Sequence, residues 1–134
     1  MKKALRITLI TLATCMAVLL AYGSYIAWSF HFGVEAERTP FSPVAWKERS
    51  NVYEHNSDPG CIRGGMALDI VATNLLQGKS ITEVKLLLGE PDGTKEEGVY
   101  YELGQCSGLG WHDSVLLVDF RNNQQVTNAN ILRY

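Results

Sequence analysis

A long run without charge near the start of the chain restricts its fold more than any other feature. No Lys, Arg, Asp or Glu occurs between Arg6 and Glu35, and residues 7–30 are mostly apolar. A helix needs about 20 apolar residues to cross the hydrocarbon core of a membrane. In that core a single segment satisfies its backbone hydrogen bonds only as a helix. Residues 1–32 are therefore expected to form a transmembrane helix that anchors the chain in a lipid bilayer.

The residues around this run predict its orientation. Lys2, Lys3 and Arg6 precede it, and such positive charge favours the cytoplasmic side of a membrane. Amphipathic aromatic rings favour the membrane interface, and four aromatic residues gather at the far end of the run: Tyr22, Tyr25, Trp28 and Phe30. We therefore expect a single-pass protein with a cytoplasmic N-terminus.

Two other interpretations of the N-terminal segment remain open. Ala21-Tyr22-Gly23 has small residues at the spacing of a cleavage site, so a cleaved signal peptide would leave Ser24 as the new N-terminus. Leu12-Ala13-Thr14-Cys15 would give a lipoprotein acylated at Cys15, although Thr14 is bulkier than the residue usual at that position. The uncharged run continues well past Gly23, which favours a retained anchor. All three interpretations place residues 35–134 outside the cytoplasm.

The part of the chain beyond the anchor is acidic. From Glu35 onward it holds nine Lys and Arg against fourteen Asp and Glu, a net charge of −5. Domains that bind nucleic acid carry a basic patch, so no nucleic-acid partner is expected. A chain of about 100 residues can bury one core of modest size.

Residues 33–60 are expected to connect the anchor to a folded domain. Two prolines and several charges favour an extended stalk. Trp46 and Tyr53 are interpreted as residues that pack at the edge of the core rather than as ligand-binding residues. A dense turn signal at residues 56–60, Asn-Ser-Asp-Pro-Gly, marks the entrance to the domain, residues 61–134.

Two amphipathic helices are predicted at the start of this domain. The first covers residues 62–77 and ends at Gly78. Its apolar stripe has helical spacing and consists of Leu68, Val71, Ala72 and Leu75. The second covers residues 81–88, and Ser80 and Glu83 fit a capping box at its start. So short a turn between two helices predicts a helical hairpin.

Beyond Pro91 the apolar pattern changes from helical to alternating, which indicates strands. Two runs each place their apolar residues on one face: Val99, Tyr101 and Leu103, then Leu116, Val118 and Phe120. A third strand is expected over residues 125–132, where a slip in the alternation predicts a β-bulge near Thr127–Asn128. The predicted fold class is α+β. After the transmembrane helix, a two-helix hairpin packs on a three-stranded antiparallel sheet, in the order ααβββ.

Cys61 and Cys106 are expected to form a disulfide, because unpaired cysteines outside the cytoplasm tend to oxidise. A zinc site is the alternative, since His55 lies six residues before Cys61 and His112 lies six residues after Cys106. This spacing is wider than that of structural zinc sites, which favours the disulfide.

The sequence contains no pattern of a hydrolase, metalloprotease, phosphate loop or dinucleotide site. We therefore expect a protein that is not an enzyme, with no cofactor, no metal and no evident small-molecule substrate. The most unusual loop is residues 106–113, where glycines flank Leu109 and Trp111. Together with His112, these residues form a candidate partner-binding loop. The alternative is that Trp111 packs over the disulfide.

Several short motifs resemble one family. Residues 76–84 (Leu-Gln-Gly-Lys-Ser-Ile-Thr-Glu-Val), 88–91 (Leu-Gly-Glu-Pro), 100–101 (Tyr-Tyr) and 118–120 (Val-Asp-Phe) resemble the SmpA/OmlA (BamE-like) domain of small bacterial envelope proteins. The resemblance implies two helices packed on a three-stranded antiparallel sheet. The best-known member of that family is an accessory lipoprotein of the outer-membrane β-barrel assembly machine. Here a transmembrane anchor is expected in place of the lipid anchor.

The anchor and the resemblance together predict a location and a function class. The location is the bacterial inner membrane, with the C-terminal domain in the periplasm. The function is that of a non-catalytic module that binds another envelope protein. One alternative is a secreted or lipid-anchored module, either inhibitor-like or an accessory of outer-membrane assembly. The other is a metal-binding envelope protein that uses Cys61, Cys106, His55 and His112.

Overall fold

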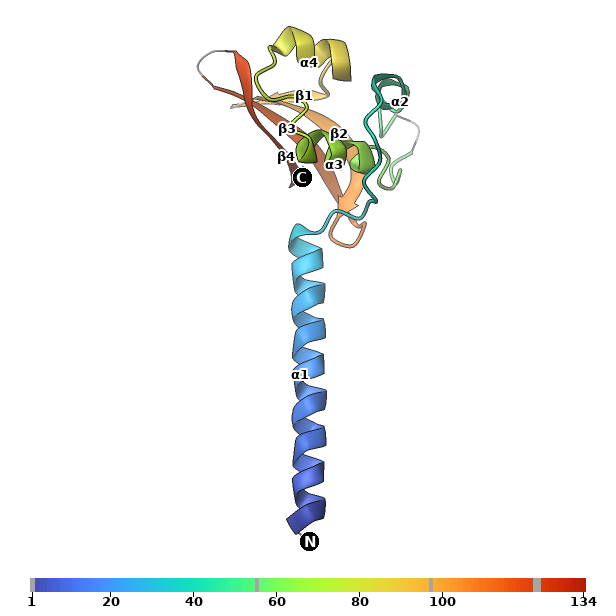
Figure 1. The fold of residues 1–134 in the computed structure, drawn as a ribbon. Coiled ribbons are helices and arrows are strands. Elements are labelled where there is room, and N and C mark those ends of the chain that lie inside the picture. Colours follow the sequence, from blue (N-terminus) through green and yellow to red (C-terminus); the bar gives the residue numbers. More distant parts are fainter. Residues whose placement is uncertain (1, 55, 97, 122–123) are drawn as a thin grey trace.

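One long helix projects from a head made of short helices and a sheet (Figure 1). The computed structural model describes residues 2–54, 56–96, 98–121 and 124–134. The elements follow in the order α1 (Lys2–Phe32), α2 (Pro43–Glu48), α3 (Gly64–Ala72), α4 (Ile81–Leu88), β1 (Gly93–Lys95), β2 (Gly98–Ser107), β3 (His112–Arg121) and β4 (Gln125–Arg133). The fold is α+β, as predicted.

Helix α1 runs unbroken through the uncharged segment (blue in Figure 1), and by length and composition it can cross a membrane. Almost all of its side chains are exposed, so the head leaves them uncovered. The hydroxyls of Thr8, Thr11 and Thr14 each donate to the carbonyl four residues earlier, at 2.9–3.1 Å. This internal bonding suits an apolar surrounding, in which no water satisfies a hydroxyl.

The sheet has four antiparallel strands in the order β1-β2-β3-β4, so the prediction of three strands is wrong by one. The additional strand, β1, pairs with the start of β2 and places Lys95 opposite Gly98. Its sequence, Gly-Thr-Lys, contains no apolar residue and therefore no alternation. Pairing with β2 creates this strand, and its own residues give no signal for it.

The predicted core face of the sheet is confirmed. Val99, Tyr101 and Leu103 of β2 are buried, and so are Leu116 and Val118 of β3. Helices α3 and α4 lie over this face (Figure 1). Since alternate residues of a strand point to opposite faces, the residues between these five lie on the side away from the helices.

The bulge predicted in the last strand is confirmed. The β3–β4 register pairs Asp119 with Asn128 and Phe120 with Val126, so Thr127 is the extra residue. The Thr127 hydroxyl donates to the Asp119 carbonyl at 3.3 Å. The bulge brings Val126 onto the buried face, where it is 2% exposed.

Helix α3 ends earlier than predicted. Asn74 takes a positive φ of 51° and closes a Schellman motif. In this motif the Asn74 amide donates to the Val71 carbonyl at 3.2 Å, and the Leu75 amide donates to the Ile70 carbonyl at 3.1 Å. Asn74 therefore has the role predicted for Gly78, and that prediction is wrong.

The predicted stripe and the predicted helical hairpin are also wrong in detail. The residues of α3 that face the core include Met66, Ala67 and Ile70, whereas Ala72 of the predicted stripe is exposed. Helix α3 packs on β2 and β4, and α4 packs on α2. The early end of α3 explains this arrangement, because the turn that follows is long enough to carry α4 away from α3.

The start and the end of α4 are confirmed. The Glu83 carboxylate accepts from the Ser80 amide and the Ser80 hydroxyl at 2.8 Å each, and the Ser80 hydroxyl accepts from the Glu83 amide at 3.4 Å. Gly89 ends the helix with a φ of 85°. Val84 and Leu88 are buried in the core of the head. The capping box therefore fixes the point at which these two residues meet the sheet.

Glu83→Gln is expected to destabilise the head at neutral pH and to have less effect in acid. The hydrogen bonds from the Ser80 amide, and then from its hydroxyl, lower the pKa of Glu83 below its ordinary value. A lowered carboxyl pKa stabilises the folded state above the unfolded pKa of about 4.3, and this contribution is lost as the pH falls through the folded pKa. Urea midpoints of the full chain in mild detergent at pH 7 and pH 3 measure the difference.

Glu48→Gln, at an exposed position at the end of α2, is the matched control and should have little effect at either pH. An equal loss from Glu83→Gln at both pH values would contradict this account of the cap.

The segment of residues 33–60 contributes to the core of the head. Trp46 of α2 is 0% exposed. Its ring meets the rings of Phe41 and Tyr101 edge to face, at centroid distances of 6.0 and 6.2 Å. Val52 is buried as well. The connecting segment therefore packs on the head through α2.

Candidate functional site

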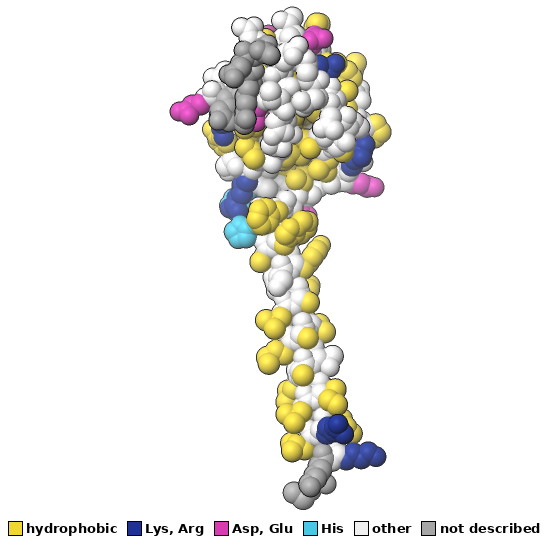
Figure 2. Space-filling view, turned by 60° about the vertical axis from the view of Figure 1, so that its left-hand side comes forward, with side chains coloured by type: hydrophobic (Ala, Val, Ile, Leu, Met, Phe, Trp, Pro, Cys, Tyr) yellow, Lys and Arg dark blue, Asp and Glu magenta, His cyan; other side chains and the backbone are white. Residues whose placement is uncertain are grey.

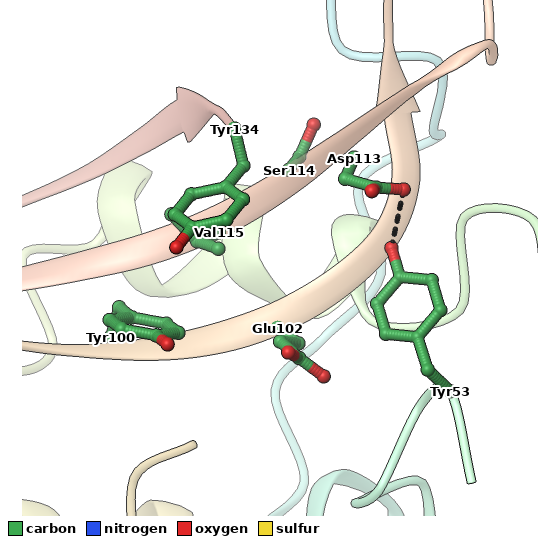
Figure 3. A pocket seen from close by; sticks show the side chains of 7 residues that line it. All are labelled: Tyr53, Tyr100, Glu102, Asp113, Ser114, Val115 and Tyr134. Carbon is green, nitrogen blue, oxygen red and sulfur yellow. Dashed lines mark hydrogen bonds between the residues drawn. The ribbon is translucent and has the colours of Figure 1, made fainter. Parts of the chain in front are cut away.

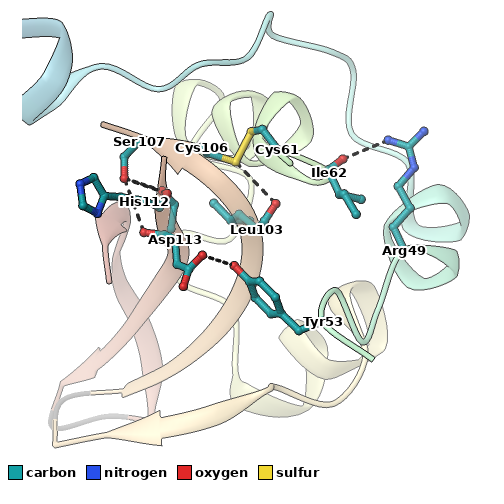
Figure 4. The surroundings of a disulfide bond; sticks show 10 residues. Arg49, Tyr53, Cys61, Ile62, Leu103, Cys106, Ser107, His112 and Asp113 are labelled. Atoms are coloured by element: carbon teal, nitrogen blue, oxygen red, sulfur yellow. Dashed lines mark hydrogen bonds between the residues drawn. A yellow bond between two sulfur atoms is a disulfide. The ribbon is translucent and has the colours of Figure 1, made fainter. Parts of the chain in front are cut away.

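Cys61 and Cys106 form a disulfide, as predicted. The bond joins the segment before α3 to the end of β2 (Figure 4). A backbone hydrogen bond connects the same two segments, because the Ile62 amide donates to the Leu103 carbonyl at 3.0 Å. The disulfide therefore fastens the start of α3 to the sheet on which α3 packs.

The alternative zinc site loses its sulfur ligands, because its two cysteines are bonded to each other. His55 lies outside the described residues. His112 has its Nε2 atom 2.6 Å from Nη2 of Arg133, and its ring packs edge to face on Phe30 at 5.5 Å. Within the described ranges, no three His, Cys, Asp or Glu side chains lie close enough together to hold a metal ion.

The predicted partner-binding loop is the turn between β2 and β3, residues 108–111. Its two apolar side chains point into solvent, since Leu109 is 43% exposed and Trp111 is 82% exposed. His112 belongs to β3 instead and lies against Phe30 of α1. His112 is therefore not part of the exposed apolar turn. Both the turn and His112 lie near the end of α1 (Figure 1).

A pocket of about 310 Å³ lies on the face of the sheet away from α3 and α4 (Figure 3). Strand alternation places Tyr100 and Glu102 of β2 on this face. Strand β3 adds Asp113, the segment after α2 adds Tyr53, and the end of the chain adds Tyr134. Ser114 and Val115 complete the lining.

Aromatic rings lie at both ends of this pocket, and carboxylates lie between them (Figure 3). At one end the Tyr53 hydroxyl donates to Oδ1 of Asp113 at 2.6 Å. At the other end the rings of Tyr100 and Tyr134 lie 5.9 Å apart, and Nζ of Lys95 lies 4.7 Å from the centre of the Tyr134 ring. Aromatic faces attract cations in this way. Lys95 already makes such a contact with the face of the Tyr134 ring.

Burial and neighbouring negative charge act on one carboxylate of the pocket, Glu102. Burial, followed by the charges of Asp92 and Asp113, raises the pKa of Glu102, while Arg63 opposes the shift. Burial and the hydrogen bond to Asp113 raise the pKa of Tyr53. A cation bound beside Glu102 would relieve this repulsion, so the pocket suits a positively charged group.

A buried arginine supports the pocket from the core side. Arg63 is 1% exposed, and its guanidinium carbon lies 4.8 Å from the centre of the Trp46 ring. Its Nη1 donates to the Glu102 carbonyl at 3.2 Å and lies 3.5 Å from Oδ2 of Asp92. Burial lowers the pKa of Arg63, and the charge of Asp92 partly offsets this effect. The Asp92 carboxylate also accepts from the Glu102 amide at 2.7 Å. Arg63 and Asp92 together therefore hold β2 in place behind the pocket.

The pocket was not predicted from the sequence. Tyr53 was interpreted as a packing residue, Asp113 was noted only as the last residue of the loop 106–113, and nothing marked Arg63 or Tyr134. The available signal was the outward position of Tyr100 and its neighbour Glu102 on β2. That signal identifies a face of the sheet. The pocket forms only when Tyr53 and Tyr134, which are distant in the sequence, pack beside this face.

Comparison of the chain with protein-family models, with curated proteins and with solved structures found no match. The resemblance to the SmpA/OmlA domain stays a prediction.

Proposed function

We propose that this chain is a non-catalytic, membrane-anchored module of a bacterial envelope that binds another envelope protein. Helix α1 crosses the inner membrane with its N-terminus in the cytoplasm, and the head lies in the periplasm. The partner inserts a basic side chain, Lys or Arg, into the pocket between Tyr53 and Tyr134.

Two features support the proposed location. Helix α1 has the length and composition of a membrane span, and Lys3 and Arg6 lie at the end that should stay in the cytoplasm. The Cys61–Cys106 disulfide suits an oxidising compartment outside the cytoplasm. Short helices on one face of an antiparallel sheet are also compatible with the SmpA/OmlA-like domain that the motifs suggest.

The pocket on the outer sheet face carries the binding proposal. Glu102 and Asp113 place two carboxylates in its lining, and their negative charge favours a positively charged group on the partner. Tyrosines suit protein recognition, since their rings supply rigid apolar area with a hydroxyl at the end. The Tyr134 side chain is 64% exposed, so this area is accessible to a partner.

The hydroxyl groups of the pocket favour binding over catalysis. The Ser114 hydroxyl donates to the Ser107 hydroxyl at 3.0 Å, so no base takes its proton. The Tyr53 hydroxyl donates to Asp113, and its raised pKa makes it a poor source of a nucleophilic oxygen. None of the seven lining residues is His, Cys or Lys.

A photoreactive benzoylphenylalanine in place of Tyr134 is expected to crosslink to a partner protein in native membranes. The crosslinked peptide should carry Lys or Arg beside the point of attachment. Glu102→Gln combined with Asp113→Asn should abolish the adduct, because the charge that holds the basic group is gone. Gel analysis and peptide mass spectrometry measure the adduct, and urea midpoints show that the charge variant is folded.

The same photoreactive residue at Leu86 is the control, because Leu86 is 69% exposed. It belongs to α4, which lies over the opposite face of the sheet (Figure 1). An adduct that forms equally from position 86, or that survives the loss of both charges, would contradict the proposed site. Absence of any adduct from position 134 would count against it in the same way.

A further inference from the structure

We propose that the β2–β3 loop, residues 108–111, enters the lipid interface beside the end of α1 and forms a second membrane contact. This inference rests on the anchoring of α1 in the proposed function. The partner of Leu109 and Trp111 is then a lipid surface and not another protein. With two contacts the head has a fixed orientation over the bilayer rather than a free one.

The loop lies beside the end of α1 from which the head begins (Figure 1). The ring of Phe30, near the end of α1, packs on His112 at 5.5 Å. Just beyond the helix, the Glu35 amide donates to the Cys106 carbonyl at 2.8 Å. These two contacts hold both ends of the loop close to the helix axis.

Helix geometry places this level at the membrane interface. If the apolar span starts after Arg6, a hydrocarbon core of about 30 Å takes about 20 residues at 1.5 Å each. The core then ends near residue 26, and Phe30 lies about 6 Å beyond it. The interface adds about 5–8 Å on each side of the core, so Phe30 and the neighbouring His112 fall within it.

The side chains of the loop suit this position. Trp111 is 82% exposed and Leu109 is 43% exposed, and the loop carries no charge. Tryptophan favours the headgroup level, where its ring is shielded and its N–H is hydrated. Aromatic side chains of α1 are exposed at a similar level: Tyr25 (61%), Trp28 (58%) and Phe32 (74%). Figure 2 shows hydrophobic side chains gathered where the helix meets the head.

A basic group completes the surface. Arg133 is exposed, and its Nη2 atom lies 2.6 Å from Nε2 of His112. Its guanidinium carbon lies 5.0 Å from the centre of the Phe30 ring. At this depth a guanidinium group is placed to meet lipid phosphates. A hollow of about 290 Å³ between α1 and β4, lined in part by Phe32 and Leu132, opens beside it. Continuity with the exposed surface of α1 favours lipid as the occupant of the whole region.

Depth-dependent fluorescence quenching tests the proposal. The full chain in a Cys15→Ser background is labelled with an NBD fluorophore at Leu109→Cys, Trp28→Cys or Leu86→Cys. Each protein is reconstituted into phosphatidylcholine–phosphatidylglycerol vesicles that carry a shallow doxyl quencher. Labels at positions 109 and 28 should be quenched to a similar extent, several times more than the label at 86. Trp111→Ser should then reduce the quenching at position 109.

Each outcome decides between distinct failures. Quenching at position 28 with none at 109 overturns the loop proposal and leaves the anchor intact. Absence of quenching at both overturns the anchor and the loop proposal together. Equal quenching at 109 and 86 overturns the loop as a specific contact, because the head would then lie against the bilayer by another surface. Unchanged quenching in the Trp111→Ser chain overturns the role of that tryptophan.

Discussion

Removal of the Cys61–Cys106 disulfide is expected to lower the free energy of unfolding of the head by about 4 kcal/mol. The bond joins residues 45 positions apart, and a crosslink over that distance restricts the unfolded chain. Single domains have total stabilities of about 5–15 kcal/mol, so the loss is a large share of the whole. The reduced head should unfold at a much lower urea concentration than the oxidised head.

Urea unfolding of the full chain in mild detergent measures this difference. It is followed by tryptophan fluorescence, to which the buried Trp46 contributes. Cys61→Ala combined with Cys106→Ala should behave like the reduced wild type. Cys15→Ser is the control, because Cys15 is exposed on α1 and lies outside the bond. It should match the oxidised wild type and lose as much on reduction. Midpoints that coincide before and after reduction would contradict the expected role of the bond.

The features that were predicted correctly depend on local patterns. The uncharged run gave α1, and strict alternation gave the core faces of β2 and β3. The out-of-phase Val126 gave the bulge at Thr127, because a one-residue slip would otherwise expose it. Ser80 and Glu83 gave the start of α4. In each of these features the signal lies within a few residues of the structure that it specifies.

The features that were missed depend on competition or on distant partners. Gly78 is the more usual residue to end a helix, but Asn74 reaches a left-handed conformation first and ends α3 there. Strand β1 exists because β2 offers it a partner, although its own residues favour no strand. The Gly78 assignment then produced the wrong helical hairpin, since it left too short a turn before α4.

The candidate pocket could be predicted only in part, because its residues come from four separate segments. Alternation shows that Tyr100 and Glu102 share the outer face of β2. No periodicity connects them to Tyr53 or to Tyr134 at the end of the chain. Arg63 is harder still to find, because a charged residue is normally solvated. Its burial becomes tolerable through contacts with Trp46, Asp92 and the β2 backbone. Tertiary packing, which the sequence does not display, assembles this site.

Trp46→Ala is expected to lower the free energy of unfolding by about 3–5 kcal/mol. Trp46 is 0% exposed, and its ring packs on Phe41 and Tyr101. Alanine would leave a cavity between α2 and the sheet, which the surrounding side chains fill only in part. Urea unfolding of the full chain in detergent measures the loss. Circular dichroism is the suitable signal, because the variant lacks the buried indole.

Trp111→Ala is the matched control, since it makes the same chemical change at a side chain that is 82% exposed. In detergent it should alter the free energy of unfolding by no more than about 0.5 kcal/mol. Trp46→Phe should fall between the two alanine variants, because it keeps most of the ring and Nε1 of Trp46 has no hydrogen-bond partner among the described residues. Equal losses from Trp46→Ala and Trp111→Ala would contradict the core role of Trp46.

A double-mutant cycle separates the cavity at Trp46 from its contact with the buried Arg63. The guanidinium group lies 4.8 Å from the centre of the indole ring, and a desolvated cation–π contact is worth about 2 kcal/mol. Trp46→Ala should therefore cost less in an Arg63→Met background than in the wild type, by about that amount. Additive losses would show that the ring only fills space. A coupled loss would show that the ring also stabilises the buried charge that holds Asp92, and with it β2, behind the pocket.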